Sequence, residues 1–253
     1  MKSANQSERS GLGPLQALGR VARIFYAPQS AAREIREQPN WVFPLLLTLL
    51  LSFVTTAVII GRPETQQALQ KALESSAQKA SELEKVKLLE AMRVVAWVGF
   101  LAAPVIANLF VAVILWGATV MMEAKIGFIP VFSYQLHAQM VTLIPRTLGV
   151  AWILGRHGAQ LTSGDLPAPF SLGNLLPAGM ASPVLQAVAA SVDIFALWYW
   201  AIIVAGLAVV AGVPWRRLLI PASFLWVLGV LLTATATLLS SSCHRRRKTL
   251  HAN

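Results

Sequence analysis

Five long apolar runs dominate this sequence and restrict what it can fold into. They lie near residues 41–61, 94–122, 131–154, 184–213 and 218–240. Each run reaches the roughly 20 helical residues that cross a hydrocarbon layer of about 30 Å, and each is continuously apolar rather than alternating. Only 13% of the residues are charged, against roughly 25% in soluble globular chains. The sequence therefore predicts an all-α integral membrane protein, a bundle of five transmembrane helices.

Residues 1–40, before the first run, are predicted to form an N-terminal interfacial and cytoplasmic segment. Over residues 14–26 apolar side chains recur at helical spacing, with Arg20 and Arg23 placed to reach lipid headgroups. This pattern is typical of an amphipathic helix that lies in the membrane surface.

Two further helices are expected outside the spans. The first would have Ser30 as its N-cap and end at Pro39. The second would cover residues 63–93, a charged stretch rich in strong helix formers. Because serines at 75–76 interrupt its apolar stripe, a solvated extramembrane arm between spans 1 and 2 is favoured over a partner-binding helix.

Two charged residues fall within the predicted spans. Ser182 and Pro183 have the pattern of an N-cap and a first helical residue, which predicts that the fourth helix begins well before Asp193. Asp193 lies about 30 Å along the fourth span when counted back from its end before Pro214. Arg146 lies about 22 Å along the antiparallel third span when counted from its start at Val131, a difference of about 8 Å. Helix tilt and a long side chain can close that difference, so we predict a polar contact between Arg146 and Asp193 that fixes span 3 against span 4.

Two other interpretations of these residues stay open. In one, Arg146 and Asp193 each reach water separately. In the other, they line a proton or ion path together with His137, since ionisable groups inside membranes often mark such paths. His137 alone is interpreted as a packing residue with a hydrogen-bonded ring.

Patterns for catalysis are not found in the sequence. It contains no phosphate-binding glycine loop, no nucleophile elbow and no HExxH motif. The spacing of the four histidines does not predict a metal site. We therefore expect a protein that is not an enzyme, with no cofactor, no bound metal, no specific nucleic acid and no identified small-molecule substrate.

Three segments resemble, in order, parts of one known family. They are "IFYAPQSAAREIREQPNWVFPLLLTLLLS", "GFIPVFSYQLHAQMVTLIP" and "DIFALWYWAIIVAGLAVVAG", the last followed by a basic turn. Over residues 20–240 the chain resembles the Yip-one domain family of integral membrane proteins, the type that interacts with Rab GTPases. The resemblance implies five membrane helices and a cytoplasmic N-terminus. The chain looks more like the bacterial members, some of which are associated with ABC-type exporters as accessory or assembly factors, and the family brings no catalytic motif.

The basic residues alone leave the orientation open. Arg216 and Arg217, in a very short turn, favour a cytoplasmic N-terminus, whereas the basic C-terminal tail, 241–253, favours a cytoplasmic C-terminus. Both hold only with an even number of crossings. The resemblance favours five spans in the bacterial cytoplasmic (inner) membrane with the N-terminus inside, where Arg216 and Arg217 would also contact lipid headgroups.

The expected function is that of a membrane scaffold, adaptor or assembly factor for another membrane system, in transport or trafficking. Its expected partners are the lipid bilayer and other membrane proteins, such as an ABC-type exporter, or a second copy of the chain. The alternative is a small transporter or channel that uses polar residues in spans 3 and 4.

Overall fold

The computed structural model describes residues 13–61, 67, 82–157, 171–175, 182, 185, 188–189 and 192–250. Every described element is a helix, apart from one isolated bridge between Ser171 and Asp193. The elements are α1 (Pro14–Tyr26), α2 (Pro28–Glu37), α3 (Val42–Ile60), α5 (Glu82–Met121), α6 (Phe128–His157), the short 3-10 helix η2 (Leu172–Leu175), α8 (Ile194–Ala211) and α9 (Trp215–Leu250). The all-helical prediction is confirmed for this part of the chain.

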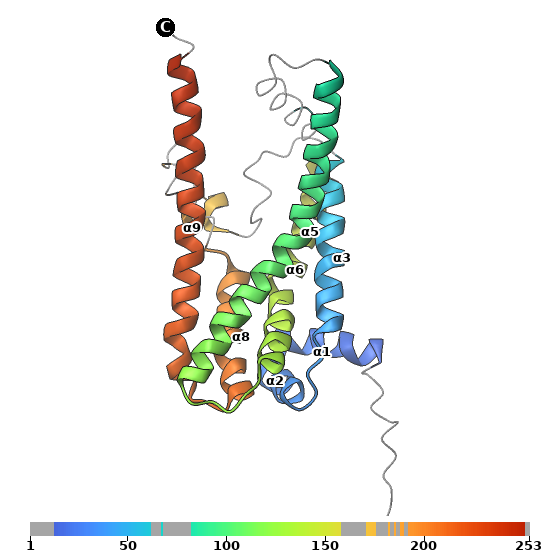
Figure 1. Ribbon diagram of the computed structural model, residues 1–253. Helices are drawn as coiled ribbons and strands as arrows, with labels where there is room; N and C mark the ends of the chain where they lie inside the picture. Colours follow the sequence, from blue (N-terminus) through green and yellow to red (C-terminus); the bar gives the residue numbers. More distant parts are fainter. Residues whose placement is uncertain are drawn as a thin grey trace, which may run out of the picture.

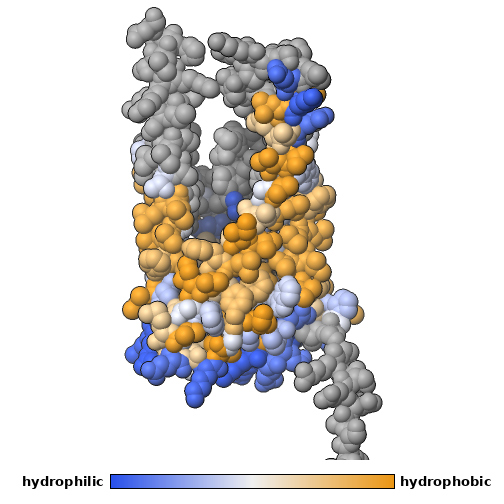
Figure 2. Space-filling view, viewed as in Figure 1, coloured by the Kyte–Doolittle hydropathy of each residue, from blue (hydrophilic) through white to orange (hydrophobic). Residues whose placement is uncertain are grey.

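Five of these helices, α3, α5, α6, α8 and α9, run alternately up and down along one direction (Figure 1). The α1–α2 pair lies across one end of this bundle, beside the α5–α6 and α8–α9 turns, while the C-terminus lies at the other end (Figure 1). Figure 2 shows apolar side chains over the middle of the visible face and hydrophilic ones gathered at the α1–α2 end. This distribution is the one expected of a helix bundle surrounded by lipid.

Among the described residues, three segments are long and apolar enough to cross a membrane: Val86–Met121, Ile194–Ala211 and Trp215–Leu232. A fourth apolar segment, Val42–Val58, is shorter. These segments coincide with four of the five predicted spans, and the count of five crossings stays a prediction.

The helix α6 corresponds to the remaining predicted span and lies at the centre of the bundle. It packs against α1, α2, α3, α5 and α8. Its residues 131–138 are all buried, including the polar side chains of Ser133, Gln135 and His137. These polar residues lower its hydropathy. Gln135 hydrogen-bonds to neighbouring helices, His137 bonds to a carbonyl of α6 itself, and the Ser133 hydroxyl has no hydrogen-bond partner among the described residues.

The main core joins the N-terminal helix pair to the bundle. Ile24 of α1 and Ile35 of α2 pack in one buried cluster with Tyr134 of α6 and with Ile203 and Leu207 of α8. The α1–α2 pair is therefore part of the packed structure, not a separate appendage.

Helix boundaries follow local sequence signals to different degrees. The first helix begins at Pro14 and ends at Tyr26, as the sequence predicts. The second begins at Pro28, with Ala27 rather than Ser30 before it, because proline fits the first turn of a helix. It ends before Pro39, at Glu37, as predicted. At the same end of the bundle, α8 ends at Ala211 with Gly212 as its C-cap, whose φ of 69° is left-handed and favours glycine.

Two predicted elements differ from the structure or lie partly outside it. The extramembrane arm predicted over 63–93 falls largely outside the described residues, and its last part, from Glu82, is continuous with α5. The helix α8 begins at Ile194, so the prediction that its helix starts before Asp193 is wrong. Ser182 does accept a hydrogen bond from the Leu185 backbone, as an N-cap would, but the chain is not helical at 192–193.

Candidate functional site

Asp193 is the N-cap of α8. Its carboxylate accepts a hydrogen bond of 2.7 Å from the backbone N–H of Phe195. The backbone beside it continues the bridge with Ser171, since the Leu172 N–H donates to the Val192 carbonyl at 3.0 Å. A carboxylate at this position satisfies a free N–H of the first turn and is stabilised by the helix dipole. Asp193 therefore has a local structural role that the sequence interpretation missed, because the helix start was placed earlier.

Arg146 lies on α6, near enough to Asp193 for the two charges to attract each other. Among the described residues no ion pair joins them, and the predicted direct contact stays a prediction. The Arg146 side chain is exposed at the helix surface, so the helices do not seal it.

His137 is separated from this pair. Its ring is buried, and Nδ1 lies 2.8 Å from the Ser133 carbonyl one turn earlier on α6. His137 precedes Arg146 by nine residues of α6, about 14 Å along the helix, and so lies nearer the start of α6. Of the three residues predicted to form an intramembrane polar contact, the structure therefore places His137 toward the N-terminal helices instead.

A chain of hydrogen bonds links three helices inside the bundle. The Tyr199 hydroxyl of α8 donates to the Gln135 side-chain oxygen of α6 at 2.8 Å. The Gln135 amide donates to Asn108 of α5 at 3.3 Å, and the Asn108 amide donates to the Pro104 carbonyl at 2.7 Å. The polar group of each side chain in this series is paired with the next, and these hydrogen bonds fix the positions of the three helices relative to one another. Gln135 and Asn108 stand out in the sequence as polar residues in apolar runs, but Tyr199 does not.

A second polar contact joins α6 to α8. Tyr134 is fully buried, and its hydroxyl donates to the Ile202 carbonyl at 2.8 Å. A side chain at Gly206 would place its Cβ 1.7 Å from that hydroxyl oxygen. Glycine is therefore required where the tyrosine lies against α8.

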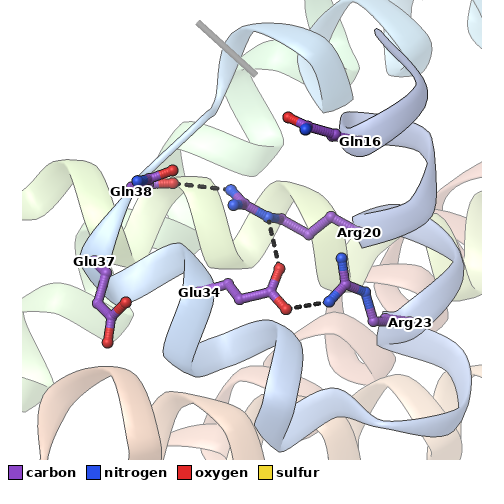
Figure 3. Close-up of a pocket in the computed structure, with 6 residues that line it drawn as sticks. All are labelled: Gln16, Arg20, Arg23, Glu34, Glu37 and Gln38. Atoms are coloured by element: carbon purple, nitrogen blue, oxygen red, sulfur yellow. Dashed lines mark hydrogen bonds and ion pairs between the residues drawn. The ribbon is translucent and has the colours of Figure 1, made fainter. Parts of the chain in front are cut away.

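A polar pocket of about 450 Å³ lies between α1 and α2, at the bundle end that carries the interhelical turns (Figure 3). It is lined by Gln16, Arg20, Arg23, Glu34, Glu37 and Gln38. Figure 3 shows Glu34 pointing between the two arginines, while Glu37 lies further along α2 with its carboxylate turned away from them. The pocket thus has a cationic side from α1 and an acidic side from α2.

Arg20 is the central residue of this pocket. Only 3% of it is exposed, its Nη1 donates to the Gln38 carbonyl at 2.8 Å, and its Nε lies 3.5 Å from Glu34 Oε2. Arg23 pairs with the other oxygen of the same carboxylate. Burial lowers the pKa of Arg20 below its ordinary value, and attraction to Glu34 offsets part of that shift. A surface arginine was predicted here; it is buried because α2 folds back over α1 and supplies Glu34.

The other two predicted headgroup contacts, Arg216 and Arg217, are exposed at the start of α9, where Arg216 lies over the Trp215 ring. Nearby, Arg36 of α2 donates from Nη1 to the Val209 carbonyl at 3.2 Å. That carbonyl belongs to the last turn of α8, where a cation satisfies a free acceptor and complements the helix dipole. No sequence signal marks Arg36, since its partner lies 173 positions away.

In the described part of the chain, no group of three or more His, Cys, Asp or Glu residues is arranged to hold a metal ion. The geometry therefore comprises contacts that join helices, together with one polar pocket at the α1–α2 end.

A comparison with protein-family models gives a match to the Yip1 domain over residues 22–236. Comparisons with curated proteins and with solved structures give no match. The matched region runs from within α1 to within α9 and includes the polar contacts among α5, α6 and α8, whereas Gln16 and Arg20 of the α1–α2 pocket lie just before it. Because the match covers most of the sequence, the chain belongs to the Yip1 domain family.

Proposed function

We propose that this chain is a non-enzymatic, multi-pass membrane protein that serves as a scaffold, adaptor or assembly factor for another membrane system. In this proposal α3, α5, α6, α8 and α9 each cross the bilayer. The membrane association itself follows from the family and from the apolar helices.

The observation that carries the proposal is how the polar side chains of α6 are used. Gln135 bonds to Tyr199 and Asn108, and the Tyr134 hydroxyl bonds to a backbone carbonyl. Groups that hold helices together in this way are not available to bind and release a substrate. This arrangement supports a rigid bundle that presents its outer surface to partners.

Two features support α6 as a fifth crossing. Its 30 residues correspond to about 45 Å of helix, more than the hydrocarbon thickness of about 30 Å. It also runs between α5 and α8, which point the opposite way (Figure 1). A central helix shielded by its neighbours can cross a bilayer with polar residues that a lipid-facing helix would not tolerate.

We propose that the α1–α2 end faces the cytoplasm, in the cytoplasmic membrane of a bacterium. Arg33, Arg36, Lys125, Arg216 and Arg217 are all exposed there, which agrees with the positive-inside rule. Residues 241–250 of the basic C-terminal segment form the last turns of α9, at the opposite end of the bundle. Orientation is tested by labelling single cysteines placed at position 33 or 216 in the Cys243→Ser background with a membrane-impermeant maleimide. Protection in intact cells and labelling after permeabilisation are expected.

The function is tested by purifying the full chain in mild detergent from its own membranes and identifying what co-purifies. A stoichiometric membrane-protein partner, retained after cross-linking within intact membranes, is expected. A disruption variant carries charged residues at Phe224 and Val227, on the exposed apolar face of α9. The same purification is repeated with this variant to measure loss of the partner. Recovery of the chain alone, together with substrate-dependent flux when it is reconstituted in liposomes, would contradict the proposal.

A further inference from the structure

The pocket between α1 and α2 has the properties of a ligand site, and we infer that it binds a phospholipid headgroup that carries both a phosphate and a primary ammonium, as phosphatidylethanolamine does. The inference rests on the proposed membrane arrangement but not on the scaffold role. The volume of the pocket, about 450 Å³, lies within the range of about 300 to 1,000 Å³ that is usual for small-molecule sites.

The cationic side of the pocket retains donors for a phosphate. Each guanidinium has five N–H donors. Across the described residues, neither Arg20 nor Arg23 uses its Nη2 group in a hydrogen bond or ion pair. Because Arg20 is almost fully buried, a phosphate that reaches it is removed from water, which strengthens the charge-assisted contacts.

The acidic side determines which phosphate compound fits. Two arginines and two glutamates line the pocket, so its formal charge is balanced. Glu34 is engaged by both arginines, whereas Glu37 makes no ion pair with any described residue. A purely anionic ligand would be repelled by Glu37, while a ligand with an ammonium beside its phosphate satisfies both sides. An N–H-bearing ammonium also donates hydrogen bonds that a quaternary one lacks.

The surroundings favour a lipid over a soluble phosphate compound. On α1, next to the pocket residue Gln16, Leu15 is 84% exposed and Leu18 is 52% exposed. Exposed leucines beside a polar pocket at the end of an apolar bundle provide contact for acyl chains. The pocket is thus positioned for a headgroup whose chains lie along the bundle.

The test titrates lipids onto the purified full chain in detergent micelles, where bilayer curvature plays no part, and measures bound lipid by native mass spectrometry and the shift in Tm. Phosphatidylethanolamine is expected to bind about tenfold more tightly than phosphatidylcholine or phosphatidylglycerol, which corresponds to about 1.4 kcal/mol. Glycerophosphoethanolamine, which has the same headgroup without acyl chains, is the soluble arm. Protection by it equal to that of the lipid would assign the site to a soluble ligand and overturn the lipid assignment.

Two variants separate the contacts. Arg23→Gln should weaken binding of all three lipids, whereas Glu37→Gln should abolish the preference for phosphatidylethanolamine and leave phosphatidylglycerol binding unchanged or stronger. Arg33→Gln on the exposed side of α2 and Glu90→Gln on α5 are matched controls outside the pocket. The inference is overturned if the three lipids bind alike, or if the pocket variants behave as the controls do. Purification of the chain without any partner protein would contradict the scaffold proposal but would not change the lipid-binding measurements. Failure of the scaffold proposal and failure of this inference can therefore be distinguished.

Discussion

The Tyr134 hydroxyl occupies the space where a side chain at position 206 would lie, so α6 and α8 approach closely only because residue 206 is glycine. The same hydroxyl donates to the Ile202 carbonyl one turn earlier on α8. The contact thus combines a steric requirement with a buried hydrogen bond.

Gly206→Ala is expected to destabilise the protein by about 1–3 kcal/mol, because the added methyl overpacks the interface and displaces the tyrosine. The measurement is the melting temperature of the purified chain in detergent. Gly117→Ala on α5 is the control, since nothing surrounds a Cβ there, and it should be neutral.

Tyr134→Phe should cost about 1 kcal/mol alone and should relieve part of the Gly206→Ala penalty, since it removes the clashing oxygen. Strict additivity of the two changes would contradict the contact.

Gln135→Leu should destabilise the bundle by about 1–3 kcal/mol, because it leaves Tyr199 and Asn108 without their partner in a buried site. The control is Gln139→Leu, one turn further along α6, where the side chain is only partly buried. Thermal denaturation in detergent should show a larger fall in melting temperature for Gln135→Leu than for Gln139→Leu. An equal fall in both variants would argue against the hydrogen bonds that join the three helices.

Arg36→Gln is expected to cost about 0.5–2 kcal/mol, since it removes a cation from the C-terminal end of α8. Arg33→Gln removes a charge from the same helix, and Arg33 makes no ion pair or side-chain hydrogen bond with another described residue. Limited proteolysis after the α1–α2 segment should be faster in Arg36→Gln than in Arg33→Gln. Equal rates would show that Arg36 does not hold α2 to α8.

Asp193 allows its capping role to be separated from its charge. Asparagine caps helices about as well as aspartate, so Asp193→Asn should keep the cap, whereas Asp193→Ala should lose about 1 kcal/mol. If attraction to Arg146 matters as well, Asp193→Asn and Arg146→Gln should each lower the yield of folded protein. Because Asp193→Arg also removes the cap, the exchange is compared with Asp193→Arg alone, and adding Arg146→Asp should partly restore the yield of that variant. No rescue by the exchange would leave Asp193 with the cap alone.

The elements that the sequence predicted well are those specified by nearby residues. Pro14 and the helical spacing that follows it fix α1, and Pro39 ends α2. The start of α8 was misplaced because Ser182 has a genuine capping pattern, while the true cap at Asp193 lies beside a bridge to Ser171 that only the folded chain brings together. The residues on either side of Asp193 in the sequence do not predict such a contact.

The polar sites were predicted less completely, for the same physical reason. Arg20 was recognised as a functional candidate, but its burial depends on Glu34 from a neighbouring helix. Gln135 is a polar residue in an apolar run of the sequence, but its partner Tyr199 lies 64 positions away. Residue type reveals that a group needs a partner, whereas the fold decides which partner it receives.

The hydrogen bond between Arg36 and the Val209 carbonyl also has a consequence for the order in which parts of the protein fold. These residues are separated by 173 positions, so α2 leaves the ribosome long before α8 exists. During that interval its buried face, Ala31, Ala32 and Ile35, lacks the α8 surface that finally covers it. Such distant contacts form late in folding. The α1–α2 pair is therefore synthesised before α8 but completes its packing only after α8 has been made.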